Sequence, residues 1–405
     1  MSTTQPPSNP GAAAAAPRTA AAPAGGSAAH ASDPRVSDAA VAGLAPAYVR
    51  AIAPYQAGKP IGELAREYGI DERTIVKLAS NENPLGMPES ARLAMMAAVG
   101  DLARYPDSNG FDLKAAIARR YGVAQAWLTL GNGSNDILEL AAHAMLQPGL
   151  SAVYAQYSFA VYALATQETG ARAIVVPARD HGHDLRAMRA AIVPDTRLVF
   201  VANPNNPTGT FLPPAEVEAF VADVPPHVVV VLDEAYNEYL EPELRADSAQ
   251  WVRKYPNLIV SRTFSKAYGL AGLRVGFGIA QPALTDLLNR VRQPFNVNSM
   301  AQAAAVAALG DDAFLARSYA LNRAGLDLLQ SEFEKLGLPY VKSYGNFVLV
   351  RVGDARAVNE SLLRAGVIVR PVASYGLPEW LRVTVGLPEE NRRFLAALKH
   401  ALGRV

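Results

Sequence analysis

The chain has 405 residues, half of them hydrophobic, which is enough for a large core and too many for one small domain. Lys and Arg number 38 and Asp and Glu number 37, so the charge balance gives no electrostatic reason to expect nucleic acid or an anionic membrane as a partner. The lack of cysteine excludes disulfides, thiolate metal sites and cysteine nucleophiles, and no apolar run approaches the ~20 residues of a membrane span.

The first 45 residues consist mostly of Ala, Pro, Ser and Gly. A secretory signal needs a continuous apolar stretch after a basic start, whereas Pro and Gly interrupt every apolar stretch here. We therefore predict a disordered tail over residues 1–45, with a transit peptide as the alternative. The chain is expected to act in the cytoplasm.

Residues 46–90 open the globular part and are expected to form an N-terminal arm and part of a small domain. Over residues 91–300, helix-like segments alternate with short apolar runs, each ending in a polar or Gly/Pro cluster. This alternation predicts an α/β domain with a mostly parallel sheet flanked by helices. The runs interpreted as strands are 151–157, 171–178, 196–204, 227–236 and 257–265. Residues 301–405 combine helices with short alternating strands, which predicts a smaller α+β domain.

Polar clusters follow four of these runs. They comprise Tyr157 and the segments 203–209, 233–236 and 263–266. Ligands of parallel α/β sheets bind beyond the carboxyl ends of the strands. We therefore expect the binding site to be built from these clusters.

Lys266 lies directly after the run 257–265. A lysine becomes a useful nucleophile when burial or neighbouring cations lower its pKa. Arg274 and the hydroxyl groups of Thr263 and Ser265 are close in sequence, and this combination suits a phosphate. Considered alone, an ordinary surface lysine beside glycine-rich turns is an equally good interpretation.

Asp233 ends the apolar run 227–236 with a carboxylate that should be nearly buried. A buried acid needs a cationic partner, and a protonated pyridine nitrogen is one such partner. Tyr236, three residues later, can direct its phenol at a ring oxygen. The alternatives are a structural aspartate and a metal-binding acid, but the chain contains no GxxxxGK[ST] segment to accompany the latter.

Two further segments favour a bound aromatic phosphate. In NPNNPTG, Asn206 precedes a proline and its amide could hydrogen-bond an aromatic hydroxyl. In GNGSNDILEL, the backbone N–H groups of Ser134 and Asn135 begin a helix and could hold a phosphate. A simple turn and a capped helix start are the respective alternatives. The six histidines show no metal-ligand spacing, so no metal site is predicted.

Taken together, NPNNPTG, LDEAY and SRTFSKAYGLAGLRVGF, in this order and spacing, resemble the fold-type I aminotransferases that use pyridoxal 5′-phosphate (PLP). Segments PYQAGKPI, KLASNENPLG, RYPD, GNGSND, YSFAVY, GNFVLV and GVIVRPVASYGLPEWLRVTVG are similar to histidinol-phosphate aminotransferases in particular. The resemblance covers essentially everything after the tail and implies a large PLP-binding domain and a smaller C-terminal domain. One departure is that YAQYSF lacks the Pro-Thr pair that precedes its tyrosine in many members.

The resemblance implies roles for the residues around PLP. Lys266 would form the Schiff base with the cofactor and shuttle a proton. Asp233 would pair with the protonated ring nitrogen, while Asn206 and Tyr236 would hydrogen-bond the ring hydroxyl. Tyr157 would stack on the ring. The residues implied to hold the phosphate are Ser134, Asn135, Thr263, Ser265 and Arg274.

The resemblance also implies a substrate site shared between two subunits. Arg370 and Arg382 would clamp anionic groups of the substrate, and Asn83 would be a further substrate contact. Tyr55 would cross to the substrate of the neighbouring subunit, and Tyr105 would reach the phosphate of that subunit's cofactor. A homodimer is therefore expected.

The activity implied is amino transfer between histidinol phosphate and 2-oxoglutarate, a step of histidine biosynthesis. An aromatic amino acid aminotransferase and a PLP-dependent threonine-phosphate decarboxylase are alternatives with the same fold. A PLP-binding regulatory domain without turnover is less favoured, because only a low-complexity tail with no basic patch precedes the aminotransferase-like part.

Overall fold

The computed structural model describes residues 41–55 and 58–404. The predicted tail of residues 1–45 lies almost entirely outside this range. The chain divides after Pro46, and the unit that begins at Ala47 contains all the sheets described below. None of the helices in the described ranges is long and apolar enough to cross a membrane.

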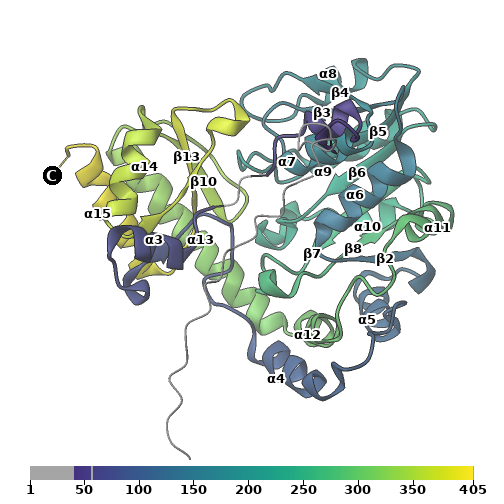
Figure 1. Ribbon diagram of the computed structural model, residues 1–405, viewed down its shortest axis with the longest axis horizontal. Helices are drawn as coiled ribbons and strands as arrows, with labels where there is room; N and C mark the ends of the chain where they lie inside the picture. Colours follow the sequence, from purple (N-terminus) through teal and green to yellow (C-terminus); the bar gives the residue numbers. More distant parts are fainter. Residues whose placement is uncertain (1–40, 56–57, 405) are drawn as a thin grey trace, which may run out of the picture. The chain divides into compact units, whose positions relative to one another are not determined.

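Seven of the strands in the described ranges form one sheet, in the order β2-β8-β7-β6-β5-β3-β4 (Figure 1). Strands β3 to β7 run parallel, and β8 is antiparallel to both of its neighbours. The bounds are β2 Leu128–Gly131, β3 Ser151–Ala155, β4 Arg172–Val176, β5 Thr196–Ala202, β6 Val229–Asp233, β7 Leu258–Thr263 and β8 Gly276–Ile279. The five apolar runs interpreted as strands thus become β3 to β7, and the predicted mostly parallel α/β fold is confirmed.

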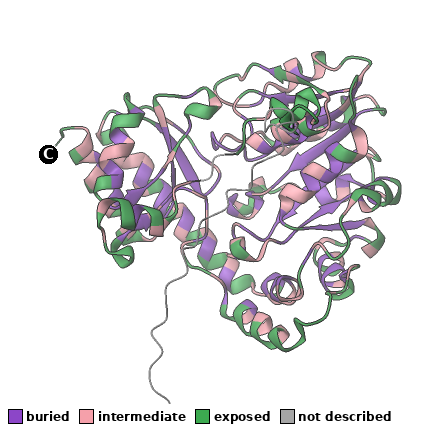
Figure 2. Cartoon of the chain, viewed as in Figure 1, coloured by how far each residue is buried: buried purple, intermediate pink, exposed green. Residues whose placement is uncertain are grey.

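The central strands of this sheet are buried on both faces, as Figure 2 shows for their ribbons. Alternate residues of β6 enter two different cores, with Val230 in one and Val231 in the other. Helices α6, α7 and α11 contribute to one core, and α5, α9 and α12 to the other. A strand covered on both faces has no polar side, which explains the continuous Val and Ile runs in the sequence.

The register of the sheet brings the ends of three parallel strands together. Ala202 of β5 pairs with Asp233 of β6, and Asp233 pairs with Ser261 of β7. The segments that continue from these residues therefore emerge side by side at one edge of the sheet.

A second group of strands comes from residues 340–384, joined by β1 from the N-terminal part of the chain. Among the described residues, β12, β13, β10 and β9 form an antiparallel sheet in that order, while β1 and β11 pair in parallel. The bounds are β1 Val76–Lys77, β9 Tyr340–Val341, β10 Phe347–Arg351, β11 Val367–Ile368, β12 Arg370–Pro371 and β13 Trp380–Thr384. Leu329, Phe333 and Phe394 help to fill their shared core.

The helices connect and cover these sheets. Their bounds are α2 Ala47–Arg50, α3 Ile61–Tyr68, α4 Glu89–Ala98, α5 Phe111–Tyr121, α6 Ser134–Met145, α7 Ala160–Glu168, α8 Leu185–Ala190, α9 Pro214–Asp223, α10 Ser248–Trp251, α11 Pro282–Val291, α12 Ser299–Leu309, α13 Asp312–Lys335, α14 Ala355–Arg364 and α15 Pro388–Ala401. The buried alanines of α12 belong to the core of the large sheet. We therefore propose that the small domain begins within α13 rather than at residue 301.

Candidate active site

A cavity of about 200 Å³ lies at the edge where β5, β6 and β7 end. Part of its lining comes from the segments that follow these strands, and part comes from Tyr55, Gly58, residues 79–81 and the strands β12 and β13. The predicted site residues that line it are Tyr55, Ser134, Asn135, Asn206, Asp233, Tyr236, Thr263, Ser265, Lys266, Arg274, Arg370 and Arg382.

Asp233 lies at the floor of this cavity, because it is the last residue of the fully buried strand β6. Its Oδ2 accepts a hydrogen bond of 2.9 Å from the hydroxyl of Tyr162 on α7. Its Oδ1 is buried and has no hydrogen-bond partner among the described residues. Burial raises the pKa of Asp233 to about 6. A cation with an N–H donor facing Oδ1 would satisfy both the charge and the free acceptor.

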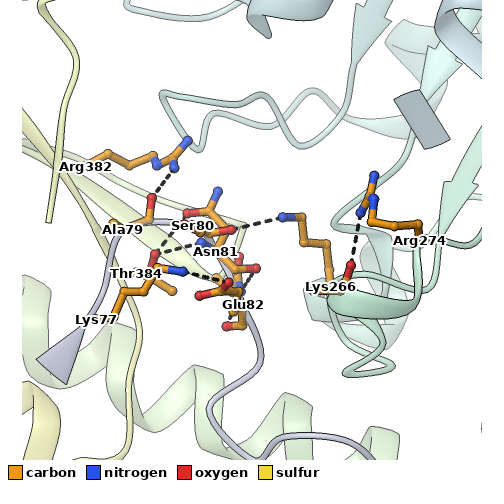
Figure 3. A network of polar contacts seen from close by, with 11 residues as sticks. Lys77, Ala79, Ser80, Asn81, Glu82, Lys266, Arg274, Arg382 and Thr384 are labelled. Carbon is orange, nitrogen blue, oxygen red and sulfur yellow. Dashed lines mark hydrogen bonds and ion pairs between the residues drawn. The ribbon is translucent and has the colours of Figure 1, made fainter. Parts of the chain in front are cut away.

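Lys266 lies across the cavity from the small domain, just after β7. Its Nζ donates a hydrogen bond of 3.2 Å to the carbonyl of Ser80, as Figure 3 shows. Burial and then the positive charge of Arg382 lower its pKa to about 8. An amine with this pKa is partly unprotonated near neutral pH and can attack a carbonyl carbon.

One end of the cavity is built to hold a phosphate. Helix α6 begins at Ser134, so the backbone N–H groups of its first turn have no partner within the helix. Nη1 of Arg274 contacts Oγ of Ser265 at 3.3 Å. Gly133 lets the guanidinium approach the helix start, since a Cβ there would lie 2.3 Å from Nη2 of Arg274. The backbone N–H groups at the start of α6 and the side chains of Ser265 and Arg274 therefore lie close together and can bind one phosphate.

The other end of the cavity carries two arginines from the small domain. Arg382 is buried, and its guanidinium donates to Oδ1 of Asn206 at 2.6 Å and to the carbonyl of Ala79 at 2.7 Å. The guanidinium of Arg370 lies 5.6 Å from the centre of the Tyr55 ring. Burial lowers the pKa of Arg382, so an anion that restores its charge balance is favoured there.

The charges in the cavity are strongly unequal. Lysine and arginine contribute four cationic side chains to the described lining, whereas Asp233 is its one carboxylate. This excess suits a ligand with both phosphate and carboxylate groups, because guanidinium groups bind either anion through paired hydrogen bonds. Within the described residues, no group of three or more histidine, cysteine or acidic side chains is arranged to hold a metal ion.

Phe159, and not Tyr157, lines the wall of the cavity. The chain turns at Tyr157 with a φ of 56°, and its ring stacks against His181 at 5.9 Å. Phe159, two residues later, precedes α7 and lines the cavity instead. Phe159 is therefore the aromatic residue of this segment that lines the cavity, and the stacking of Tyr157 on a bound ring stays a prediction.

Asn83 also lies outside the lining. Its amide nitrogen donates to the carbonyl of Ala267 and to the hydroxyl of Ser318, which ties the loop to α13. Asn81 takes the cavity position, since its backbone turns through a φ of 54° and its side chain points at Tyr236. Asn83 thus has a structural contact with the chain around α13, and its expected substrate contact stays a prediction.

Two tyrosines were expected to act across a subunit boundary. Tyr55 lines the cavity of its own chain, near Arg370, and its reach to a neighbouring subunit's substrate stays a prediction. Tyr105 lies away from this cavity, is 82% exposed and stacks on Phe295 with ring centres 4.6 Å apart.

A buried ion cluster adjoins the site through the strand that leads to Lys266. Arg262 of β7 is 5% exposed, and its guanidinium contacts the carboxylates of Glu234 at 2.6 Å and Glu238 at 3.2 Å. Ser248 also donates to Glu234. Because Glu234 follows Asp233 directly, this cluster fixes the chain on both sides of the cavity floor.

This fold and site are those of a PLP-dependent aminotransferase. The family model for aminotransferase class I and II matches residues 73–398. The free Oδ1 of Asp233, the poised Lys266 and the donors at the start of α6 match the ring nitrogen, the aldehyde and the phosphate of PLP, respectively. The cofactor therefore fits the residues that are present.

The chain is 72% identical over 361 residues to histidinol-phosphate aminotransferase 1 of Cupriavidus pinatubonensis, which covers 88% of this chain and 96% of that protein. It is 70% identical over 363 residues to histidinol-phosphate aminotransferase 2 of Ralstonia nicotianae, with 89% and 97% covered. The crystal structure of histidinol-phosphate aminotransferase from Sinorhizobium meliloti with PLP has a TM-score of 0.82 at 30% identity and covers 89% of this chain and 98% of its own. The chain belongs to the histidinol-phosphate aminotransferase family.

Proposed function

We propose that this enzyme transfers an amino group between histidinol phosphate and 2-oxoglutarate. The observation that carries the proposal is the pair Arg370 and Arg382 at the end of the cavity away from the phosphate-holding start of α6. The same two guanidinium groups can bind a phosphate in one half-reaction and carboxylates in the other. The names of two similar proteins support histidinol phosphate as a substrate.

The chemistry follows from the positions of the side chains. PLP, when bound, supplies an electron sink for the charge that develops at the substrate's Cα. Asp233 would accept the hydrogen bond of the ring N–H and keep that proton in place. Lys266 would hold the cofactor and is placed to move a proton from the substrate's Cα.

Steady-state kinetics with the purified holoenzyme test the proposal. Histidinol phosphate is expected to have a kcat/KM well above those of phenylalanine and tyrosine. Arg370→Met should raise the KM for histidinol phosphate by about tenfold to a hundredfold, the effect of losing one charged hydrogen bond. If an aromatic amino acid has the higher kcat/KM, the enzyme is an aromatic aminotransferase. Release of carbon dioxide from phosphothreonine would instead identify a decarboxylase.

We also propose that the enzyme works as a homodimer in the cytoplasm, where its co-substrates 2-oxoglutarate and glutamate are metabolised. Large apolar side chains are exposed around the segment that holds Tyr105. They are Leu93, Met96, Val99, Leu102, Tyr105, Phe111 and Phe295. An exposed apolar patch of this kind favours a protein contact. A second copy would cover it and bring Tyr105 towards the neighbouring cofactor.

Sedimentation of wild type and Met96→Glu tests the dimer. Wild type is expected at twice the mass of the chain and the variant as a monomer. A monomeric wild-type enzyme with full activity would contradict the proposal. The compartment is tested by cell fractionation, where recovery with the membrane or periplasmic fraction would contradict it.

A further inference from the structure

Asn81 forms the centre of a hydrogen-bond chain from Thr384 of β13 to Tyr236, and Figure 3 shows Asn81 and Thr384. It is 1% exposed and follows Ser80, the residue whose carbonyl accepts from Lys266. Its backbone N–H donates to Oγ1 of Thr384 at 3.0 Å, and Oγ1 in turn contacts Oδ1 of Asn81 at 3.1 Å. Its Nδ2 contacts the hydroxyl of Tyr236 at 2.8 Å.

The hydrogen bonds of this chain have directions that the chemistry of their groups allows. A backbone N–H can only donate, so Oγ1 of Thr384 accepts from Asn81. The hydroxyl proton of Thr384 is then free to be donated to Oδ1 of Asn81. With the amide in this orientation, its oxygen faces Thr384 and its nitrogen donates to Tyr236. The oxygen of Tyr236 therefore accepts from Asn81, and its own proton must point elsewhere.

The remaining direction for that proton is the cavity, which Tyr236 lines beside Asn206 and Lys266. Burial of Tyr236 raises its pKa to about 12, so the phenol keeps its proton at neutral pH. Acceptance from Asn81 makes the phenol a stronger donor, because linked hydrogen bonds polarise one another.

We propose that Thr384 and Asn81 are positioning residues that hold the hydroxyl proton of Tyr236 towards the ring hydroxyl oxygen of bound PLP. The inference rests on the placement of that oxygen beside Tyr236. A proton donated there stabilises negative charge on the oxygen, most of all when the neighbouring Lys266–cofactor linkage has lost its proton. The relay therefore makes the linkage easier to deprotonate.

The test is a pH titration of the visible absorbance of the holoenzyme, which reports the pKa of the linkage independently of turnover. Tyr236→Phe should raise this pKa by about one to two units, the effect of losing a hydrogen bond to a charged group. Thr384→Val has nearly the same shape but no hydroxyl, so Asn81 can turn its oxygen towards Tyr236 and draw the proton away. It should raise the pKa by a substantial part of the same shift.

Thr384→Ser keeps the hydroxyl and is the matched control, with a linkage pKa close to that of wild type. In the Tyr236→Phe background, Thr384→Val should add nothing. Asn81→Ala is a second probe for the case that Thr384→Val does not fold, and it should give a rise that also disappears without the Tyr236 hydroxyl. The charged groups that act on Lys266 are Arg382, Glu82, Arg274 and Asp233, and every variant leaves them unchanged.

Two results would overturn the relay. One is an unchanged linkage pKa in Thr384→Val and in Asn81→Ala when Tyr236→Phe raises it. The other is an equal rise from Thr384→Val with and without the Tyr236 hydroxyl. If Tyr236→Phe itself leaves the pKa unchanged, the placement of the ring hydroxyl fails, and the relay fails with it. Amino transfer from histidinol phosphate is measured separately and can stand in either case.

Discussion

Removal of one hydroxyl, in Tyr162→Phe, should change the pH range over which the protein binds its cofactor. The hydroxyl of Tyr162 is fully buried and donates to Asp233 at 2.9 Å. Phenylalanine keeps the ring, which stacks on Phe200 with centres 4.6 Å apart, so packing is retained. The variant removes the donor and little else.

The size of the effect follows from the charge of the acceptor. A hydrogen bond to a charged group contributes about 1.5–3 kcal/mol, which corresponds to a pKa change of about one to two units. Because the bond favours the ionised carboxylate, its loss raises the pKa of Asp233. In the cofactor-free protein this pKa is about 6, so the variant should titrate at about pH 7–8.

Binding of the protonated ring requires the ionised carboxylate, so cofactor affinity falls about tenfold per pH unit below the pKa of Asp233. Titration of cofactor-free protein with PLP between pH 5.5 and 8.5 measures this dependence. The midpoint should move up by one to two units in Tyr162→Phe. Tyr154→Phe is the control, because Tyr154 is also largely buried and its ring centre lies 6.5 Å from that of Tyr162. An unchanged midpoint, or an equal change in the control, would refute the reasoning.

Three further predictions concern the floor of the cavity. Asp233→Asn should retain bound cofactor, seen by absorbance, but lose about 100-fold in kcat because a neutral amide cannot hold the ring proton; an unchanged kcat would contradict this. Lys266→Met should abolish turnover, and borohydride should no longer fix the cofactor to this peptide. The same change should stabilise the cofactor-free protein by about 2–3 kcal/mol at pH 7, since the pKa of Lys266 falls from 10.5 to about 8 on folding. Wild-type stability should rise between pH 8 and 10.5, where the unfolded chain holds the extra proton, and denaturant titrations of the variant should lack this rise. Arg262→Leu should lower the free energy of unfolding by about 3–5 kcal/mol, because Glu234 and Glu238 would stay buried without their cation; a loss below 1 kcal/mol in urea unfolding would argue against it.

Much of the site could be predicted from the sequence because a parallel sheet converts chain order into spatial order. Asp233 and Lys266 each follow a continuous apolar run, and parallel strands end at the same edge. Asn206 follows a third such strand. The structure brings all three into one cavity. Strand pairing achieves this although the stretch from Asn206 to Lys266 spans 61 residues of sequence.

The residues that sequence reasoning missed depend on local backbone conformation and on helix orientation. Tyr157 and Asn81 both have positive φ, which turns their side chains by an amount that no residue pattern shows. Phe159 and Asn81 line the cavity, and the sequence pattern singled out neither of them. Tyr162 reaches Asp233 from α7, and nothing in the sequence fixes which side of that helix faces the strand end.

The residues of the cavity come from two separate structural sources. The contacts expected for PLP lie on the large sheet and on α6, whereas Arg370 and Arg382 belong to the sheet of the small domain. A change in substrate preference therefore requires new side chains only on the second sheet and the residues before α3. Substitutions in β12 and β13 would let the enzyme accept other anionic amino donors. The residues that hold the cofactor would remain the same.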